Sequence, residues 1–142
     1  MTIHIRQAVA DEQSMLRGII SGAHLDPTHL RWQNFVVAEW VGQIAGIAQI
    51  KPYRDCREFG SLVVLAEFRK RGIAAALIEH CLASEHGRIY LMCRDNMESF
   101  YARWGFQRIS FADAPRTLRR KLAVTAVMRL FGIRLICMRR DA

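Results

Sequence analysis

The stretch Ser61–Leu82 joins an unbroken apolar run to a helix-patterned segment through a basic, glycine-containing loop, and it constrains the fold more than any other part of the chain. The run Leu62–Leu65 is too short to cross a membrane and is rich in β-branched residues, which indicates a buried strand. After the loop Phe68–Gly72, apolar residues recur at the spacing of a helix, at Ile73, Leu77, Ile78 and Leu82. A helix that begins at such a loop directs unpaired backbone N–H groups and the positive end of its dipole at a ligand. The junction therefore favours an anion, most simply a phosphate or pyrophosphate.

Length and composition predict one globular domain, residues 1–142. A chain of 142 residues can bury a sizeable core without disulfides, and 51% hydrophobic with 24% charged residues is typical of a folded domain. The four cysteines are scattered, so we expect reduced thiols and no metal site. No apolar run reaches membrane-spanning length and the N-terminus lacks a secretory signal, so we expect a cytoplasmic protein without a membrane span.

The formal net charge of +8 predicts attraction to an anionic partner without identifying it. A phosphorylated cofactor, nucleic acid and an acidic membrane surface all meet that condition. No nucleic-acid partner is expected, because the chain shows no nucleic-acid motif and few aromatic residues among its basic runs. A second basic cluster is either a solvated helix face or a site for an acidic protein, nucleic acid or membrane surface; it consists of Arg116, Arg119, Arg120 and Lys121.

The pattern of apolar residues along the chain predicts strands mixed with helices. Before the central junction we expect a strand at Ile3–Ala8, a helix at Glu12–Ser21 capped by Asp11, an irregular segment at His24–Gln33, paired strands at Asn34–Trp40 and Ile44–Ile50, and a turn at Pro52–Arg57. After it we expect the central helix to stop at Gly87, followed by a strand at Ile89–Cys93, a helical stretch at Arg94–Arg103, a strand at Phe106–Phe111, a helix at Pro115–Leu130 capped by Asp113, and a strand at Ile133–Arg139. Hairpins followed by strand–helix–strand argue for the α/β class with a mixed sheet.

Two sequence elements resemble the GNAT superfamily of N-acetyltransferases. Arg69–Ala74 matches the R/Q-x-x-G-x-G/A signature of that family, between a strand and an amphipathic helix. Phe100–Phe106, FYARWGF, resembles the F-Y-x-x-x-G-F element that follows the next strand in the family. A short motif gains weight when its structural context matches as well. The resemblance implies the GNAT-type acyl-CoA N-acyltransferase fold, a central mixed β-sheet flanked by helices, and an acetyl-CoA-dependent N-acetyltransferase that acts on a primary amine.

The resemblance also implies where acetyl-CoA, the co-substrate, would bind. The loop N–H groups would hold the pyrophosphate, with Gly72 allowing close approach of the backbone. The preceding strand would pair with the pantetheine amides, and the N–H of Val64 would polarise the thioester carbonyl. The residues assigned to the cofactor in this way are Leu62, Val63, Val64, Arg69, Lys70, Arg71, Gly72, Ile73, Ala74 and Asn96. The alternative for the loop Arg69–Ala74 is a solvated basic turn that binds no cofactor.

Two residues carry the proton transfers that the resemblance implies. A lysine-like amine has a pKa of about 10.4, so it is mostly an ammonium group at neutral pH. The ammonium group must lose a proton before its nitrogen can attack the thioester directly. Glu58 matches the general base of several relatives, and Tyr101 matches the tyrosine that protonates the departing thiolate. Each has an ordinary alternative: a strand-edge carboxylate that faces water, and an aromatic ring that packs on Phe106.

The chain also departs from the family pattern. Ala66 and Lys70 stand where many relatives have a proline and a second glycine, and the interval from Asn96 to Tyr101 is shorter than usual, which would place the family's asparagine at Arg94. The helix Pro115–Leu130 enlarges a connection that is often a simple loop.

Several functional questions stay open from sequence. His24 and His29 either line an acceptor site or belong to a polar surface segment. A non-catalytic acyl-CoA sensor or anion-binding module on the same fold is the alternative to the enzyme, and nothing selects the acceptor. Exposed sheet edges make a homodimer plausible.

Overall fold

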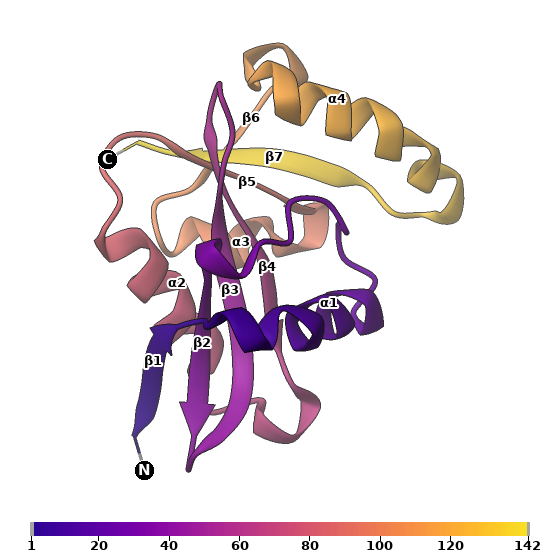
Figure 1. Ribbon diagram of the computed structural model, residues 1–142. Helices are drawn as coiled ribbons and strands as arrows, with labels where there is room; N and C mark the ends of the chain where they lie inside the picture. The colour runs from indigo at the N-terminus through magenta and orange to yellow at the C-terminus, as the bar shows by residue number, and fades with distance from the viewer. Residues whose placement is uncertain (1, 142) are drawn as a thin grey trace. The chain divides into compact units, whose positions relative to one another are not determined.

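The computed structural model of the protein describes residues 2–141 (Figure 1). The strands are β1 (Ile3–Gln7), β2 (Phe35–Trp40), β3 (Gln43–Pro52), β4 (Arg57–Val64), β5 (Ile89–Arg94), β6 (Gln107–Ile109) and β7 (Leu135–Arg140). The α-helices are α1 (Gln13–Gly22), α2 (Ile73–Ala83), α3 (Glu98–Ala102) and α4 (Arg116–Thr125). The chain forms two compact units: the residues up to Lys51 with Phe59–Glu85, and Pro52–Glu58 with the residues from His86 onward. None of the described helices is long and apolar enough to cross a membrane.

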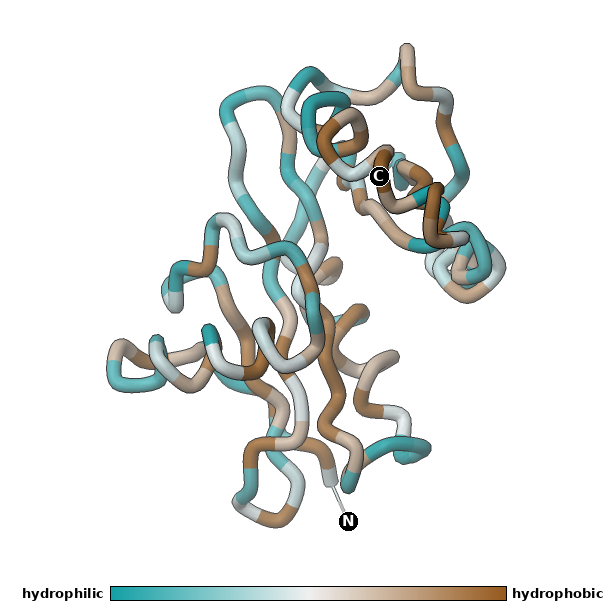
Figure 2. Tube along the Cα trace, turned by 90° about the vertical axis from the view of Figure 1, so that its right-hand side faces the viewer, coloured by the Kyte–Doolittle hydropathy of each residue, from teal (hydrophilic) through white to brown (hydrophobic). Residues whose placement is uncertain are grey.

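The first unit orders its strands β1-β2-β3-β4. β1 runs antiparallel to β2, and β2 runs antiparallel to β3. The turn between β2 and β3 consists of Val41 and Gly42, with φ of 50° and 74°, the left-handed geometry that a two-residue hairpin requires. α1 buries Leu16 and Ile20 against the sheet residues Phe35, Val37 and Ile47. Apolar residues thus recur along strands and helices, whereas the turn between β3 and β4 is hydrophilic (Figure 2).

Gly46 on β3 permits close packing against α2 and β4. A Cβ at this position would lie 3.0 Å from the Val63 carbonyl oxygen and 3.1–3.2 Å from side-chain atoms of Leu77 and Ile73. These separations are shorter than ordinary van der Waals contacts, so only glycine fits without movement of its neighbours. The close approach of α2 to β3 therefore depends on the absence of a side chain at Gly46.

The second unit orders its three strands β5-β7-β6, with β7 antiparallel to both neighbours. Leu118 of α4 is fully buried and packs with Tyr90 of β5 and Cys137 of β7. α4 is thus built into the core of this unit, and a 3-10 segment, Ala126–Phe131, continues it to Gly132.

Most expected elements occur within a few residues of their expected bounds, but four boundaries differ: the starts of α1 and α4 and the ends of α2 and β6. The expected helix caps Asp11 and Asp113 both lie inside short 3-10 turns that precede α1 and α4. The N-cap position of α4 is Pro115, and the carboxylate that binds its first turn comes from Asp55, which accepts hydrogen bonds from the Thr117 N–H at 3.0 Å and hydroxyl at 2.7 Å. α2 ends at Ala83 and does not continue to Gly87. β6 is shorter than expected, because Phe111–Asp113 turns into a 3-10 helix.

Candidate functional site

The junction between β4 and α2 has the form expected of an anion-binding loop. β4 ends at Val64, a 3-10 turn covers Ala66–Phe68, and α2 begins at Ile73. Gly72 has φ of 78° and its carbonyl accepts the Ala76 N–H at 3.1 Å. The N–H groups of residues 73–75 consequently have no carbonyl four residues back within the helix, and they point out of its positive end.

Two arginines of this loop are held by the first unit. The Arg71 guanidinium lies over the Trp40 ring, 4.9 Å from its centroid, and 6.0 Å from the centroid of Phe68. Arg69 donates from Nε to the Val64 carbonyl at 3.3 Å. Arg69, Lys70 and Arg71 are exposed. The loop therefore presents three cations, and the stacking of Arg71 restricts one of them to a defined position.

Ser61 lies within β4, just before the expected pantetheine-binding edge, Leu62–Val64. Its φ of 58° is left-handed, which is uncommon for a residue with a side chain. Its hydroxyl accepts a hydrogen bond from the Gln49 side-chain amide at 2.7 Å. This backbone conformation could not be predicted from the sequence, since no local signal distinguishes Ser61 from an ordinary strand residue.

Glu58 is buried, at 5% exposed, and does not face water. Its Oε1 accepts the Tyr53 hydroxyl at 2.9 Å and the Lys121 ammonium at 3.2 Å, and Lys121 also donates to the Tyr53 hydroxyl. Burial, followed by the charge of Glu58, raises the pKa of Tyr53. Both of the hydrogen bonds to Glu58 reach the same oxygen, Oε1.

Lys121 neither faces solvent nor is free to bind a partner, the two roles expected for the basic cluster of Arg116, Arg119, Arg120 and Lys121. Its side chain is 17% exposed and is paired with Glu58. The other three cluster members, Arg116, Arg119 and Arg120, belong to α4 as expected. The pairing of Lys121 with Glu58 could not be predicted from the sequence, because Lys121 follows Glu58 by 63 residues.

Tyr101 lies on α3 among aromatic rings. Its ring makes edge contacts with Phe100 and Phe106, with centroids 5.1 Å and 6.3 Å away. Burial, with a smaller effect of Cys93, raises the pKa of Tyr101 to about 12. The phenol is therefore protonated at neutral pH and has a proton to give.

The remaining expected site residues lie in different parts of the two units. Leu62–Val64 and the loop Arg69–Ala74 belong to the first unit, and Glu58, Asn96 and Tyr101 belong to the second. Asn96 is exposed in the 3-10 turn Asp95–Met97. His24 and His29 are exposed on the irregular segment after α1. Among residues 2–141, no group of three or more His, Cys, Asp or Glu side chains could hold a metal ion.

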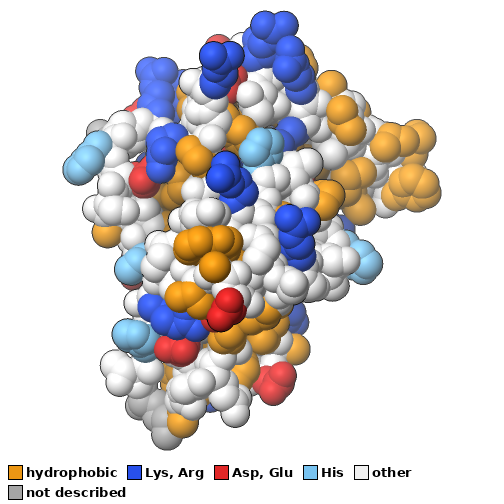
Figure 3. All heavy atoms as spheres, in the orientation of Figure 1, with side chains coloured by type: hydrophobic (Ala, Val, Ile, Leu, Met, Phe, Trp, Pro, Cys, Tyr) orange, Lys and Arg blue, Asp and Glu red, His pale blue; other side chains and the backbone are white. Residues whose placement is uncertain are grey.

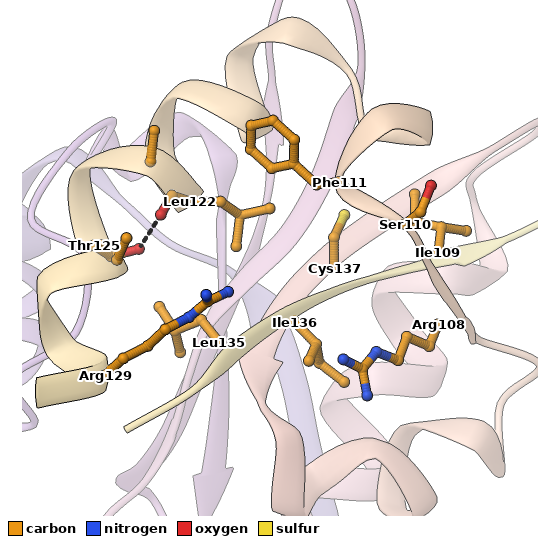
Figure 4. A pocket seen from close by; sticks show the side chains of 12 residues that line it. Arg108, Ile109, Ser110, Phe111, Leu122, Thr125, Arg129, Leu135, Ile136 and Cys137 are labelled. Atoms are coloured by element: carbon orange, nitrogen blue, oxygen red, sulfur yellow. Dashed lines mark hydrogen bonds between the residues drawn. The ribbon is translucent and has the colours of Figure 1, made fainter. Parts of the chain in front are cut away.

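A separate cavity of about 400 Å³ lies within the second unit, between α4 and the β6–β7 pair (Figure 4). Leu122, Leu135, Ile136 and Cys137 contribute apolar lining, and Arg108 and Arg129 lie at its sides. None of its lining residues is an expected cofactor-binding or catalytic residue.

Solved structures of other proteins have a similar fold. The chain superposes on N-acetylglutamate synthase from Neisseria gonorrhoeae, complexed with coenzyme A and N-acetyl-glutamate, with a TM-score of 0.77 and 22% identity, over 99% of this chain and 35% of that one. It superposes on a GNAT-family acetyltransferase from Staphylococcus aureus Mu50 with a TM-score of 0.73 and 15% identity, over 99% of both chains. These similarities confirm the expected fold class, a mixed α/β sheet flanked by helices.

Sequence comparison gives the family. An uncharacterized N-acetyltransferase of Chlorobaculum tepidum is 34% identical over 95 residues, which are 65% of this chain and 60% of that protein. This chain therefore matches less than two thirds of that relative's length. Residues 31–108, more than half of the chain, match the acetyltransferase (GNAT) domain family. The match spans β2 to β6 and includes both the anion-binding loop and Tyr101, so this chain belongs to the GNAT family of acetyltransferases.

Proposed function

We propose that this protein is an acetyl-CoA-dependent N-acetyltransferase that transfers the acetyl group to a primary amine by direct attack. The loop between β4 and α2 carries the proposal, because it combines free helix N–H groups, a left-handed Gly72 and three cations in a chain of the GNAT family. The synthase of similar fold was solved with coenzyme A, which supports the same nucleotide here. A diphosphate matches such a loop in charge and in hydrogen bonding.

The expected cofactor residues would divide the binding of acetyl-CoA between phosphate and pantetheine. Backbone N–H groups of Arg71–Ala74 would hold the diphosphate, and Arg69 and Lys70 would add positive charge. The edge Leu62–Val64 would pair with the pantetheine amides, and the Val64 N–H would polarise the thioester carbonyl. Asn96 is the last of the expected cofactor-binding residues.

Tyr101 and Glu58 would move the protons of the reaction. As the amine nitrogen forms its bond to the carbonyl carbon, the carbon–sulfur bond breaks and the nitrogen loses a proton. Oε2 of Glu58 would accept that proton, directly or through water, while Tyr53 and Lys121 hold Oε1. Tyr101 would donate its proton to the thiolate, which its raised pKa keeps available. Positioning of the two reactants would supply most of the rate gain.

Calorimetry and a thiol-release assay test the proposal together. Acetyl-CoA should bind with a Kd well below 1 mM, and free CoA should appear when a suitable amine is added. The amine panel contains small diamines, amino acids, lysine peptides and peptides with free N-termini. Failure to bind acetyl-CoA at millimolar concentration would contradict the proposal.

A non-catalytic acyl-CoA-binding protein is the second candidate. The ion pair between Glu58 and Lys121 favours it, since a carboxylate bound to an ammonium resembles a structural pair more than a free base. The two candidates differ in the thiol-release assay. Tight binding of acetyl-CoA with no thiol release on any amine would favour the sensor.

A further inference from the structure

The far end of α4 exposes a cluster of large apolar side chains that we call the tip patch. It consists of Val124, Val127, Leu130 and Phe131, which are 78%, 57%, 82% and 79% exposed. Figure 3 shows hydrophobic side chains gathered at the right of the view, where α4 and the following 3-10 segment lie in Figure 1. The opposite face of α4 is already used, since Leu118 and Leu122 pack into the core of the second unit. Exposed apolar patches of this kind mark interaction sites.

The segment of the chain that holds the tip patch carries only positive charges. Residues 114–140 contain no Asp or Glu and eight basic residues, which are Arg116, Arg119, Arg120, Lys121, Arg129, Arg134, Arg139 and Arg140. Arg116 and Arg120 precede Val124 at intervals of four residues, so the three lie on one face of the helix. Within the described residues, Arg116, Arg120 and Arg129 have no ion pair. One helix face is thus cationic in its first turns and apolar at its end.

The arrangement of arginines and apolar side chains on α4 favours some binding partners of the tip patch over others. A second copy of the chain would bring two sets of unpaired arginines together, and like charges oppose that contact. The patch covers the end of α4 and the 3-10 segment that follows it (Figure 3). Projecting Leu, Phe and Val side chains beside arginines are typical of helices that insert shallowly into the headgroup region of a bilayer.

We propose that the end of α4 docks on the surface of an anionic lipid bilayer. Val124, Val127, Leu130 and Phe131 enter the boundary between headgroups and acyl chains. Arg116 and Arg120, one to two turns back along the same face, contact lipid phosphates at the bilayer surface, and Arg129 adds a third cation beside the patch. The contact is peripheral and reversible, and it does not depend on acetyl transfer.

Vesicle flotation with the full chain tests the proposal. Vesicles of 70% phosphatidylcholine and 30% phosphatidylglycerol should carry the protein upward at 50 mM salt, and vesicles of pure phosphatidylcholine should carry much less. Raising the salt to 500 mM should reduce binding, because it screens the arginine contacts. The double variant Leu130→Ser with Phe131→Ser should lower the partition coefficient about tenfold or more. The double variant Arg116→Ser with Arg120→Ser should lower it about 20-fold.

Matched controls separate this surface from general effects of charge and hydrophobicity. Arg17→Ser with Arg31→Ser removes two exposed arginines of the first unit and lowers the net charge equally. Val9→Ser with Val41→Ser removes two exposed apolar side chains elsewhere. Both controls should float as the unchanged protein does. All variants change exposed residues, and equal thermal unfolding temperatures would show that each remains folded.

Three results would overturn the proposal. The first is the absence of flotation with anionic vesicles. The second is equal loss of flotation in the tip variants and in their controls. The third is a sedimentation measurement in which the tip variants abolish self-association or binding of an acidic protein while flotation stays unchanged, which would assign the patch to a protein partner.

Discussion

Tyr101 combines a half-buried position among aromatic rings with a hydroxyl that stays protonated. We predict that Tyr101→Phe lowers kcat about 100-fold, the usual contribution of a general acid, with little change in the Kd of acetyl-CoA. The pKa of about 12 adds a pH test, because the acid form persists below that pH and is lost only as pH approaches it. Steady-state kinetics should therefore show no fall of kcat between pH 8 and pH 10. Tyr90→Phe, which removes a hydroxyl from the core of the same unit, should leave kcat unchanged; equal kcat for Tyr101→Phe and the unchanged protein would exclude the acid role.

Glu58 and Lys121 form a buried pair whose structural and catalytic roles can be separated. We predict that Lys121→Met lowers the free energy of unfolding by about 3 kcal/mol, because it leaves a buried carboxylate without its cation. Glu58→Gln should lower kcat/KM about 100-fold if Oε2 is the base. The double variant carries neither charge, so urea unfolding should show part of the stability restored. Activity should stay low in that variant, and activity that returned together with stability would show that Glu58 acts only through the fold.

Site residues that belong to a local motif could be predicted from the sequence, whereas side-chain partners far apart in the chain could not. The loop residues could be assigned because their meaning is local: cations and Gly72 between a strand and a helix already specify an anion site. The partners of Glu58 could not be assigned from sequence, since Lys121 follows it by 63 residues and no local pattern links the two residues. Asp113 does not cap α4, because its N–H and carboxylate are hydrogen-bonded to Ser110 within the same turn. The carboxylate that binds the Thr117 N–H comes from Asp55, which is again too far away in the chain to be predicted.

The start of α2 depends on one backbone conformation. We predict that Gly72→Ala weakens acetyl-CoA binding about tenfold, because a Cβ at φ of 78° is strained and would stand where the backbone approaches a phosphate. Gly132→Ala is a close control: Gly132 also has φ of 78°, and a Cβ at either glycine meets no atom within 4 Å. Both variants should lose about 1 kcal/mol of stability. Calorimetry should show weaker acetyl-CoA binding for Gly72→Ala alone, and equal weakening in both would remove the loop from the binding site.

The packing of α2 on β3 depends on the missing side chain of Gly46. We predict that Gly46→Ala lowers the free energy of unfolding by about 2 kcal/mol, because the new methyl group would overlap the Val63 carbonyl and the side chains of Leu77 and Ile73. Gly18→Ala makes the same chemical change inside α1, where a Cβ meets nothing within 4 Å, and it should stabilise the protein by about 0.5 to 1 kcal/mol. Urea unfolding of both variants checks the opposite signs. A Gly46→Ala protein as stable as the unchanged one would mean that α2 can shift without cost.

At the scale of the whole molecule, the sequence predicts one domain, whereas the chain forms two compact units. The boundary falls inside β4: Arg57 and Glu58 belong to one unit, and Phe59–Val64 belongs to the other. Because one strand contributes residues to both units, we expect their unfolding to be coupled. We therefore expect a single cooperative transition.

Two core substitutions, one in each unit, test this coupling. Leu16 of the first unit and Leu118 of the second are both fully buried, so replacing either leucine with alanine should cost about 2 to 5 kcal/mol. In a single cooperative domain, Leu16→Ala and Leu118→Ala each lower the Tm of one shared calorimetric transition, and the calorimetric and van't Hoff enthalpies agree. In a pair of independent units, each variant would instead split the transition and shift only the part that holds its own leucine. The second pattern would contradict the one-domain prediction, and it would make β4 a linker between two separately folding units.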